Sequence, residues 1–139
     1  MTEYSTLVTI KSNLMKKNKT DQVLQECTAW ERLLDFFKQE NSYLKTRLSE
    51  VLDNKTDKDF LALAEHFQNQ FILKDEFVDE MLHDVREQEK NLNILAEKKA
   101  IIEERLIKKQ QKIRNEMEFL EKDFNRMKNE FNKYLVSVL

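Results

Sequence analysis

Apolar residues recur at alternating spacings of four and three through most of this 139-residue chain. This spacing places them on one face of an α-helix and repeats as a heptad. The first stripe covers about four heptads and predicts a helix over residues 20–52, with Thr20 and Asp21 at its start. Its members are Val23, Cys27, Trp30, Leu34, Phe37, Asn41, Leu44, Leu48 and Val51.

This first stripe is broad, because Leu24, Leu33 and Phe36 lie beside it. A broad apolar face is typical of a bundle helix with two neighbours rather than of a two-stranded zipper. Asn41 is the polar member of the stripe. It either sets the register by meeting another polar core residue, such as Gln88 or its own copy, or lies at the bundle edge.

The clearest break in the helical pattern covers residues 53–57, which are rich in Asp and Asn. Thr56 followed by Asp59 resembles a capping box with Asp in place of Glu. The heptad pattern then resumes and predicts a second helix over residues 57–90. A short connection between two long helices favours an antiparallel hairpin.

The end of the second helix is marked less clearly. Asn91, Leu92 and Asn93 suit a turn without Gly, yet the apolar spacing continues through them. A turn at 90–93 gives a third helix over residues 94–138, whereas no turn gives a single helix of about 80 residues. The fold class we predict is all-α, an antiparallel three-helix bundle or coiled-coil hairpin with long helices. The alternative is a helical hairpin with one very long second helix.

We expect residues 20–139 to form a single helical bundle domain. The N-terminal segment 1–19 has a weak helical stripe but also many β-branched residues, so it is either disordered or a short helix. In the third helix, the apolar spacing between Leu106 and Met117 amounts to an 11-residue step. Such a step predicts a local relaxation of a left-handed supercoil.

The predicted third helix is about 12 residues longer than its neighbours, an excess of roughly 18 Å. Its last turns carry an apolar stripe that nothing in the predicted bundle covers. Exposed apolar stripes generally bind a partner. The partner-binding residues we predict are Phe131, Tyr134, Leu135 and Val138.

The chain contains neither Gly nor Pro, whereas average usage would give roughly ten and seven. Phosphate-binding loops, dinucleotide-binding turns and nucleophile elbows require Gly, so these enzyme classes are excluded. We therefore expect no catalytic residues, no cofactor and no enzymatic activity. Cys27 has no His nearby and falls in a core position, which favours a buried small residue over a nucleophile.

Charge is distributed unevenly along a chain whose net charge is only −2. Residues 53–90 sum to −6 and residues 91–139 to +3. These segments either attract each other, attract partner copies, or form two solvated faces.

Glu76, Glu80, His83 and Glu87 recur at helical spacing on one face of the second helix. Glu80 and His83 have the i, i+3 spacing that di-iron bundles use, but the second such pair is missing. The face is either a divalent-cation or basic-partner surface, or a solvated helix face. A carboxylate and histidine metal site formed between copies is thus an alternative function.

A basic run extends from Arg105 to Arg114 and contains no acidic residue. Its interpretations are contact with phosphates, as in a weak nucleic-acid binder, or docking against the acidic second helix. Lys108, Lys109, Lys112 and Arg114 are the candidate phosphate contacts. We consider nucleic acid an unlikely partner, because the run lacks aromatic residues for base stacking.

No apolar run is long enough for a membrane helix, and no secretory signal is evident. Together with a single Cys, these features favour a cytoplasmic protein that does not bind membranes. The leading hypothesis is a non-enzymatic coiled-coil interaction or scaffold protein. It acts by self-association as a homo-oligomer, or by docking onto a protein partner through the third helix.

Overall fold

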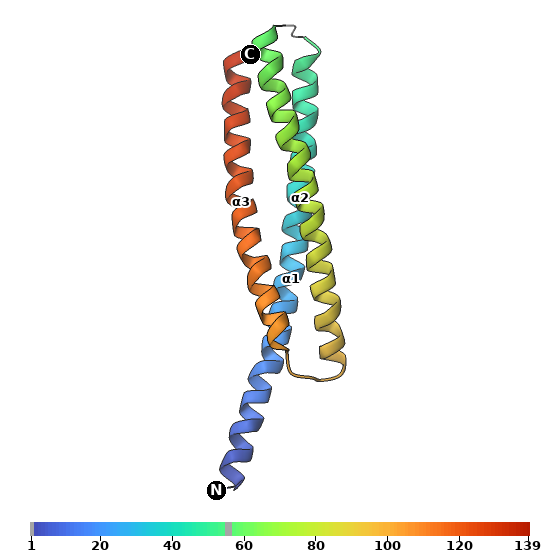
Figure 1. The fold of residues 1–139 in the computed structure, drawn as a ribbon, viewed down its shortest axis with the longest axis vertical. Coiled ribbons are helices and arrows are strands. Elements are labelled where there is room, and N and C mark those ends of the chain that lie inside the picture. Colours follow the sequence, from blue (N-terminus) through green and yellow to red (C-terminus); the bar gives the residue numbers. More distant parts are fainter. Residues whose placement is uncertain (1, 55–56) are drawn as a thin grey trace.

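The computed structural model describes the backbone of residues 2–54 and 57–139, and the side chains of that part from residue 19 onward. Three helices account for nearly all of it: α1 (Thr2–Leu52), α2 (Lys58–Glu97) and α3 (Glu104–Val138). They pack side by side along a common axis (Figure 1). The predicted all-α three-helix bundle is confirmed, and the alternative of one very long second helix is wrong.

Helices α1 and α3 run parallel. Arg114 pairs with Glu26 at 2.6 Å, and the side chains of Lys128 and Glu40 also form an ion pair. In both pairs the two residues are 88 positions apart in the sequence. Later residues of α1 therefore pair with later residues of α3, as in parallel helices. These pairs flank the core as the g and e positions of a parallel coiled coil do.

Helix α2 runs antiparallel to both. Lys38 of α1 contacts Asp79 at 2.7 Å, and Lys45, further along α1, pairs with the earlier residue Asp75. The chain therefore goes up, down and up again, as two short connections require.

The apolar stripes of the three helices form one continuous core, as predicted. Every member of the first stripe is buried, Asn41 included. Where the first turns of α2 meet the last turns of α3 the core contains an aromatic cluster, with Phe71 and Phe131 packed edge to face at 5.1 Å between ring centroids. Such pairs stabilise a core beyond the apolar area that they bury.

The connection between α1 and α2 lies where the sequence predicts it. The Asp57 carboxylate accepts a hydrogen bond from the Asp59 backbone N–H at 3.0 Å and so caps α2. Thr56, the predicted first member of a capping box, lies outside the described residues.

The predicted turn at 90–93 is wrong, because α2 continues to Glu97. The helix ends where Lys99 adopts a left-handed backbone conformation, with φ of 52°. The Ala100 N–H then bonds to the Leu95 carbonyl, and the Lys99 N–H to the Ala96 carbonyl. These two bonds define a Schellman motif, which usually has Gly at the left-handed position. Consequently α3 begins at Glu104 rather than at residue 94.

The predicted start of the first helix at Thr20 is also wrong. Residues 2–19 belong to α1, which is therefore a single helix of 51 residues. Thr20 is buried inside this helix instead of capping it. Since residues 2–19 contain no Gly or Pro, no residue in them interrupts the helix.

Candidate functional site

The C-terminal apolar stripe is covered, so the reason for predicting it as a partner-binding surface is wrong. Phe131, Tyr134 and Leu135 are buried, and Val138 packs against the core. The Tyr134 ring stacks on Phe60 at 5.4 Å, and its hydroxyl donates to the Phe60 carbonyl at 3.0 Å. Because α3 starts ten residues later than predicted, its last turns lie beside the first turns of α2 instead of projecting.

The most elaborate polar arrangement is inside the bundle, where Gln110 of α3 reaches both other helices. Its amide nitrogen donates to the Val23 carbonyl at 3.2 Å, and its amide oxygen accepts from Gln88 at 3.1 Å. Gln88 also donates to the Leu106 carbonyl at 2.7 Å. The Cys27 thiol lies 3.7 Å from the same Gln110 oxygen. We refer to Cys27, Gln88 and Gln110 as the polar layer.

Sequence reasoning missed Gln110, although a signal was present. Leu106, Gln110, Ile113 and Met117 follow the regular spacing of four, three and four, and all are buried. The predicted 11-residue step is therefore wrong, because it arose from counting only apolar residues.

An ion pair closes the polar layer on the side where α1 meets α3. Glu26 accepts hydrogen bonds from Gln110 at 2.9 Å and from Arg114 at 2.6 Å. Burial opposes ionisation, but these hydrogen bonds and the Arg114 charge hold the pKa of Glu26 below its usual range. Burial raises the pKa of the Cys27 thiol to about 11, partly offset by its hydrogen bond to Gln110. The thiol is thus protonated at neutral pH and suited to packing.

Asn41 does not meet Gln88, so that proposed pairing is wrong. Its amide nitrogen donates to the Phe71 carbonyl at 2.8 Å and to the Asp75 carboxylate at 2.7 Å. Its amide oxygen is buried without a hydrogen-bond partner. Asn41 therefore connects α1 to α2, while Gln88 connects α2 to α3.

The acidic face of α2 is solvent-exposed. His83 contacts Glu87 at 3.6 Å, with 78% and 64% of their side chains accessible. Among the described residues, His83 and Glu87 could share an ion with Asp84, whereas Glu76 and Glu80 are not part of that group. Asp84 also lies 3.9 Å from Lys109. Exposed acidic groups at helical spacing are common on solvated faces, so we assign no metal ligands here.

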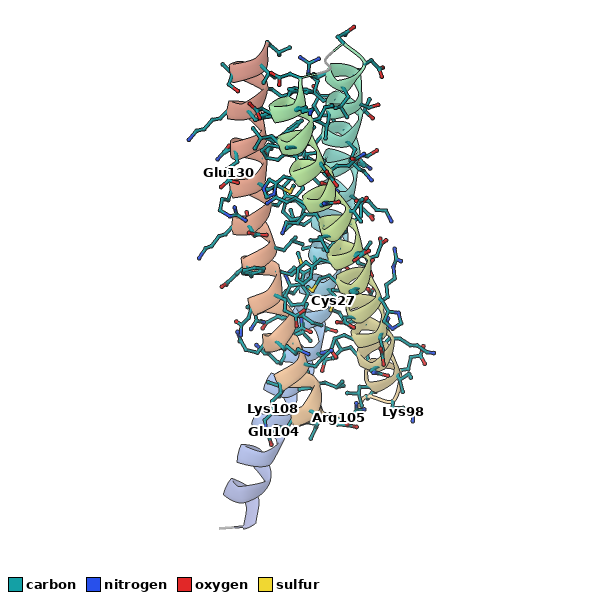
Figure 2. The ribbon with its side chains drawn as sticks, turned by 45° about the horizontal axis from the view of Figure 1, so that its top comes forward. Cys27, Lys98, Glu104, Arg105, Lys108 and Glu130 are labelled. Atoms are coloured by element: carbon teal, nitrogen blue, oxygen red, sulfur yellow. The ribbon has the colours of Figure 1, made fainter. Side chains whose placement is uncertain are left out.

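All five basic residues of the run 105–114 lie near a carboxylate. Three of these partners are in α3 or directly before it: Glu103 for Arg105, Glu104 for Lys108 and Glu116 for Lys112. Docking against acidic α2 involves only Lys109, through Asp84. Arg105 and Lys108 lie near the end of the bundle formed by the α2–α3 connection (Figure 2). Lys108 and Lys112 remain 78% and 66% exposed in these pairs, and exposed ion pairs of this kind are weak.

Several large apolar side chains are exposed on the surface, and among them are two groups of aromatic residues. On α1, Phe36 and Tyr43 are one heptad apart and are 53% and 64% exposed. Between α2 and α3, the exposed Phe119 ring packs edge to face against Phe77 at 6.4 Å. Single exposed apolar residues are ordinary on protein surfaces. Two rings in contact across two helices form a small apolar patch.

Within the described part of the chain, the first part of α1 is the helical segment that extends past the bundle. The blue end of α1 projects beyond the α2–α3 connection, with no other helix beside it (Figure 1). Thr20 and Asp21 line a small cavity with Ala96 at the end of α2 and with Lys99 and Ala100 of that connection, and so mark the end of the bundle. We refer to residues 2–18 as the α1 arm.

Comparison of this chain with family models, with curated proteins and with solved structures found no match. In the described part of the chain, no helix combines the length and the apolar character needed to cross a membrane.

Proposed function

We propose that this chain is a non-catalytic helical interaction or scaffold protein that self-associates through the α1 arm. The observation that carries the proposal is the length of α1, 51 residues against 40 for α2 and 35 for α3. The excess is the helical arm that leaves the bundle (Figure 1).

A lone helix is a poor structure in water. Most helical stability in proteins comes from packing of an amphipathic face rather than from intrinsic propensity, and no other helix lies beside the arm (Figure 1). The arm contains several Thr and Asn residues, which are weak helix formers. A packing partner outside the bundle supplies the missing stabilisation. A second copy of the chain is present in every solution of the protein and presents an identical arm.

Light scattering coupled to gel filtration tests this proposal on the intact chain. We expect a mass of about twice 16.8 kDa, as for a dimer with two-fold symmetry. The substitution Asn13→Pro interrupts the arm, because proline removes a helical hydrogen bond and clashes with the preceding turn. This variant should elute as a monomer with the bundle still folded.

The matched control is Asn13→Ala, which keeps the helix and should retain the wild-type mass. A wild-type chain that is monomeric at every concentration, or a proline variant that associates like the wild type, contradicts self-association through the arm.

We further propose that the protein works in a reducing compartment such as the cytoplasm. Cys27 is its only cysteine, is buried and is free. A packing role for a lone buried thiol suits compartments in which thiols are kept reduced.

A further inference from the structure

The interface between α1 and α2 carries a row of charged side chains. Two of its contacts join opposite charges, Lys38 with Asp79 and Lys45 with Asp75. Nearer the end from which the α1 arm projects, Glu31 of α1 lies opposite Glu89 of α2. The row therefore includes a pair of like charges, which ordinarily destabilises an interface between helices.

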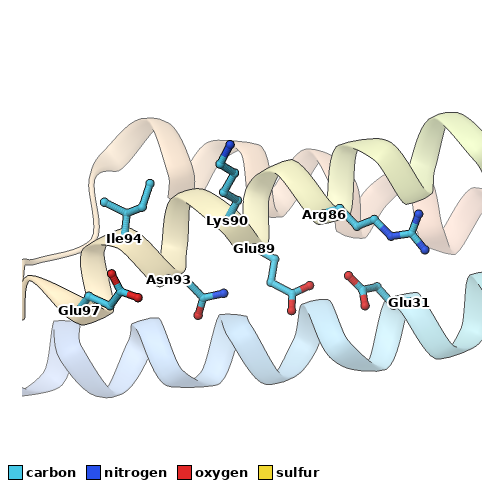
Figure 3. A pocket seen from close by; sticks show the side chains of 7 residues that line it. All are labelled: Glu31, Arg86, Glu89, Lys90, Asn93, Ile94 and Glu97. Carbon is cyan, nitrogen blue, oxygen red and sulfur yellow. The ribbon is translucent and has the colours of Figure 1, made fainter.

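The Glu31 and Glu89 carboxylates point toward one another across the two helices (Figure 3). Both residues are half-buried, so water screens them only partly. They line one groove of about 460 Å³. We refer to them as the carboxyl pair.

Several other charged groups surround the carboxyl pair. Arg86, Lys90 and Glu97 of α2 line the same groove, and the Lys90 ammonium points away from the pair (Figure 3). On α1, the Cys27 thiol lies close enough to sense the charges of Glu26, Glu31 and Glu89. Helix α3 supplies no lining residue to the groove in the described part of the chain.

Two carboxylates in contact retain one proton more readily than a single carboxylate does. The hydrogen bond with Glu31 is the main cause that raises the pKa of Glu89 to about 7, followed by burial and by the Glu31 charge. Arg86 acts in the opposite direction. The two groups titrate as a unit, so this value belongs to the pair.

We propose that the carboxyl pair, which faces across the groove between the two helices, is a pH-sensitive latch: a proton shared between Glu31 and Glu89 holds α1 against the end of α2. In the protonated form, one carboxyl donates a hydrogen bond to the other across the helices. In the fully ionised form, the two charges repel and the last turns of α2 are held less tightly. The latch lies at the end of the bundle from which the α1 arm projects, but it does not depend on the function proposed above.

The direction of the pH effect follows from proton binding. In the unfolded chain Glu89 has an ordinary carboxyl pKa, so between about pH 4.5 and pH 7 the folded protein binds more protons than the unfolded chain. The latch therefore contributes its full stabilisation below this range. The contribution is lost as the pH rises through about 7.

Thermal unfolding of the intact protein and of Glu89→Gln, from about pH 5.5 to about pH 8, tests the latch. A Gln amide can donate the same hydrogen bond to Glu31 without titrating. We expect the Tm of the wild type to fall over this range by about 4 °C more than that of the variant. The matched control is Glu80→Gln on the exposed face of α2, which should keep the wild-type profile.

A direct readout is the titration of the Glu89 side-chain carbon by NMR in the wild-type protein and in Glu31→Gln. We expect a midpoint near neutrality in the wild type and a return toward the ordinary carboxyl range in the variant. A wild-type midpoint in the ordinary range overturns the proposal. So do Tm profiles of the wild type and Glu89→Gln that fall in parallel.

Discussion

Gln110 shows what a single polar side chain does in this core. Its amide bonds to α1 and α2 at once, through Val23 and Gln88. A displacement of α3 along its axis would leave these buried groups without partners, at a cost of about 1–3 kcal/mol each. The polar layer therefore favours one register of the three helices over the neighbouring ones.

Gln110→Leu should lower the free energy of unfolding by about 1–3 kcal/mol, because the Gln88 amide and the Glu26 carboxylate each lose a partner. Denaturation in urea measures the change. The matched control is Gln39→Leu at an exposed position of α1, which should change stability by less than about 0.5 kcal/mol.

The double variant with Gln88→Leu and Gln110→Leu tests whether the loss of stability comes from a polar group left without its partner. Replacing both partners with apolar groups of similar size can be nearly neutral. We therefore expect it to recover part of the loss. A single variant as stable as the wild type would contradict the role assigned to Gln110.

At this scale the sequence identifies positions better than partners. Asn41 and Gln88 were predicted as core positions from the heptad spacing, and both are buried. Their partners depend on the axial offset between helices, which the spacing within one helix does not contain. For the same reason the sequence does not predict that Glu31 faces Glu89. Each residue lies beside the apolar stripe of its own helix, as many other charged residues do.

Among the elements, the α2–α3 connection departs furthest from expectation. Lys99 adopts a positive φ of 52°, a conformation that costs a non-Gly residue about 1–2 kcal/mol. The Schellman hydrogen bonds at Ala100 and Lys99 offset this cost by satisfying the last carbonyls of α2. The hydrogen bonds of the turn thus hold Lys99 in a backbone conformation that lysine does not favour by itself.

Lys99→Gly should raise the free energy of unfolding by about 0.5–1 kcal/mol, because Gly adopts this conformation without a steric penalty. Lys98→Gly is the matched control. Lys98 has φ of −79°, so the same substitution there should destabilise the protein by about 0.5–1 kcal/mol. Thermal or chemical denaturation compares the two variants. Equal and opposite effects are not required, but a destabilised Lys99→Gly contradicts this interpretation.

The helices themselves could be predicted from sequence, whereas three of their ends could not: the start of α1, the end of α2 and the start of α3. Core residues on both sides of the turn keep the heptad spacing of the sequence; they are Leu92, Ile102 and Leu106, and all are buried. The apolar pattern therefore does not show where α2 ends. Asn91 and Asn93 suit a turn by type but lie within α2. The turn lies about ten residues later than predicted, and α1 starts eighteen residues earlier. The helix that extends past the bundle is therefore α1 at its N-terminus, not the third helix at its C-terminus.

The whole molecule is a rod whose ends differ. At one end the C-terminus of α3 packs on the first turns of α2, with Tyr134 stacked on Phe60. At the other end the α1 arm leaves the bundle (Figure 1). Self-association through the arm would therefore join two molecules end to end, while contact through the side of the bundle, such as the Phe77 and Phe119 patch, would place them side by side.

Small-angle X-ray scattering distinguishes these arrangements by length. At 1.5 Å per residue, the 51 residues of α1 set the maximum dimension of a single molecule at about 77 Å. Two molecules whose arms overlap antiparallel should reach about 128 Å, because the overlap of about 17 residues removes roughly 26 Å. Side-by-side association leaves the length near 77 Å while doubling the mass. We expect the longer value for the wild type and the shorter one for Asn13→Pro, since an interrupted arm cannot pair. A dimer of the shorter length would assign the contact to the bundle surface and remove the role proposed for the arm.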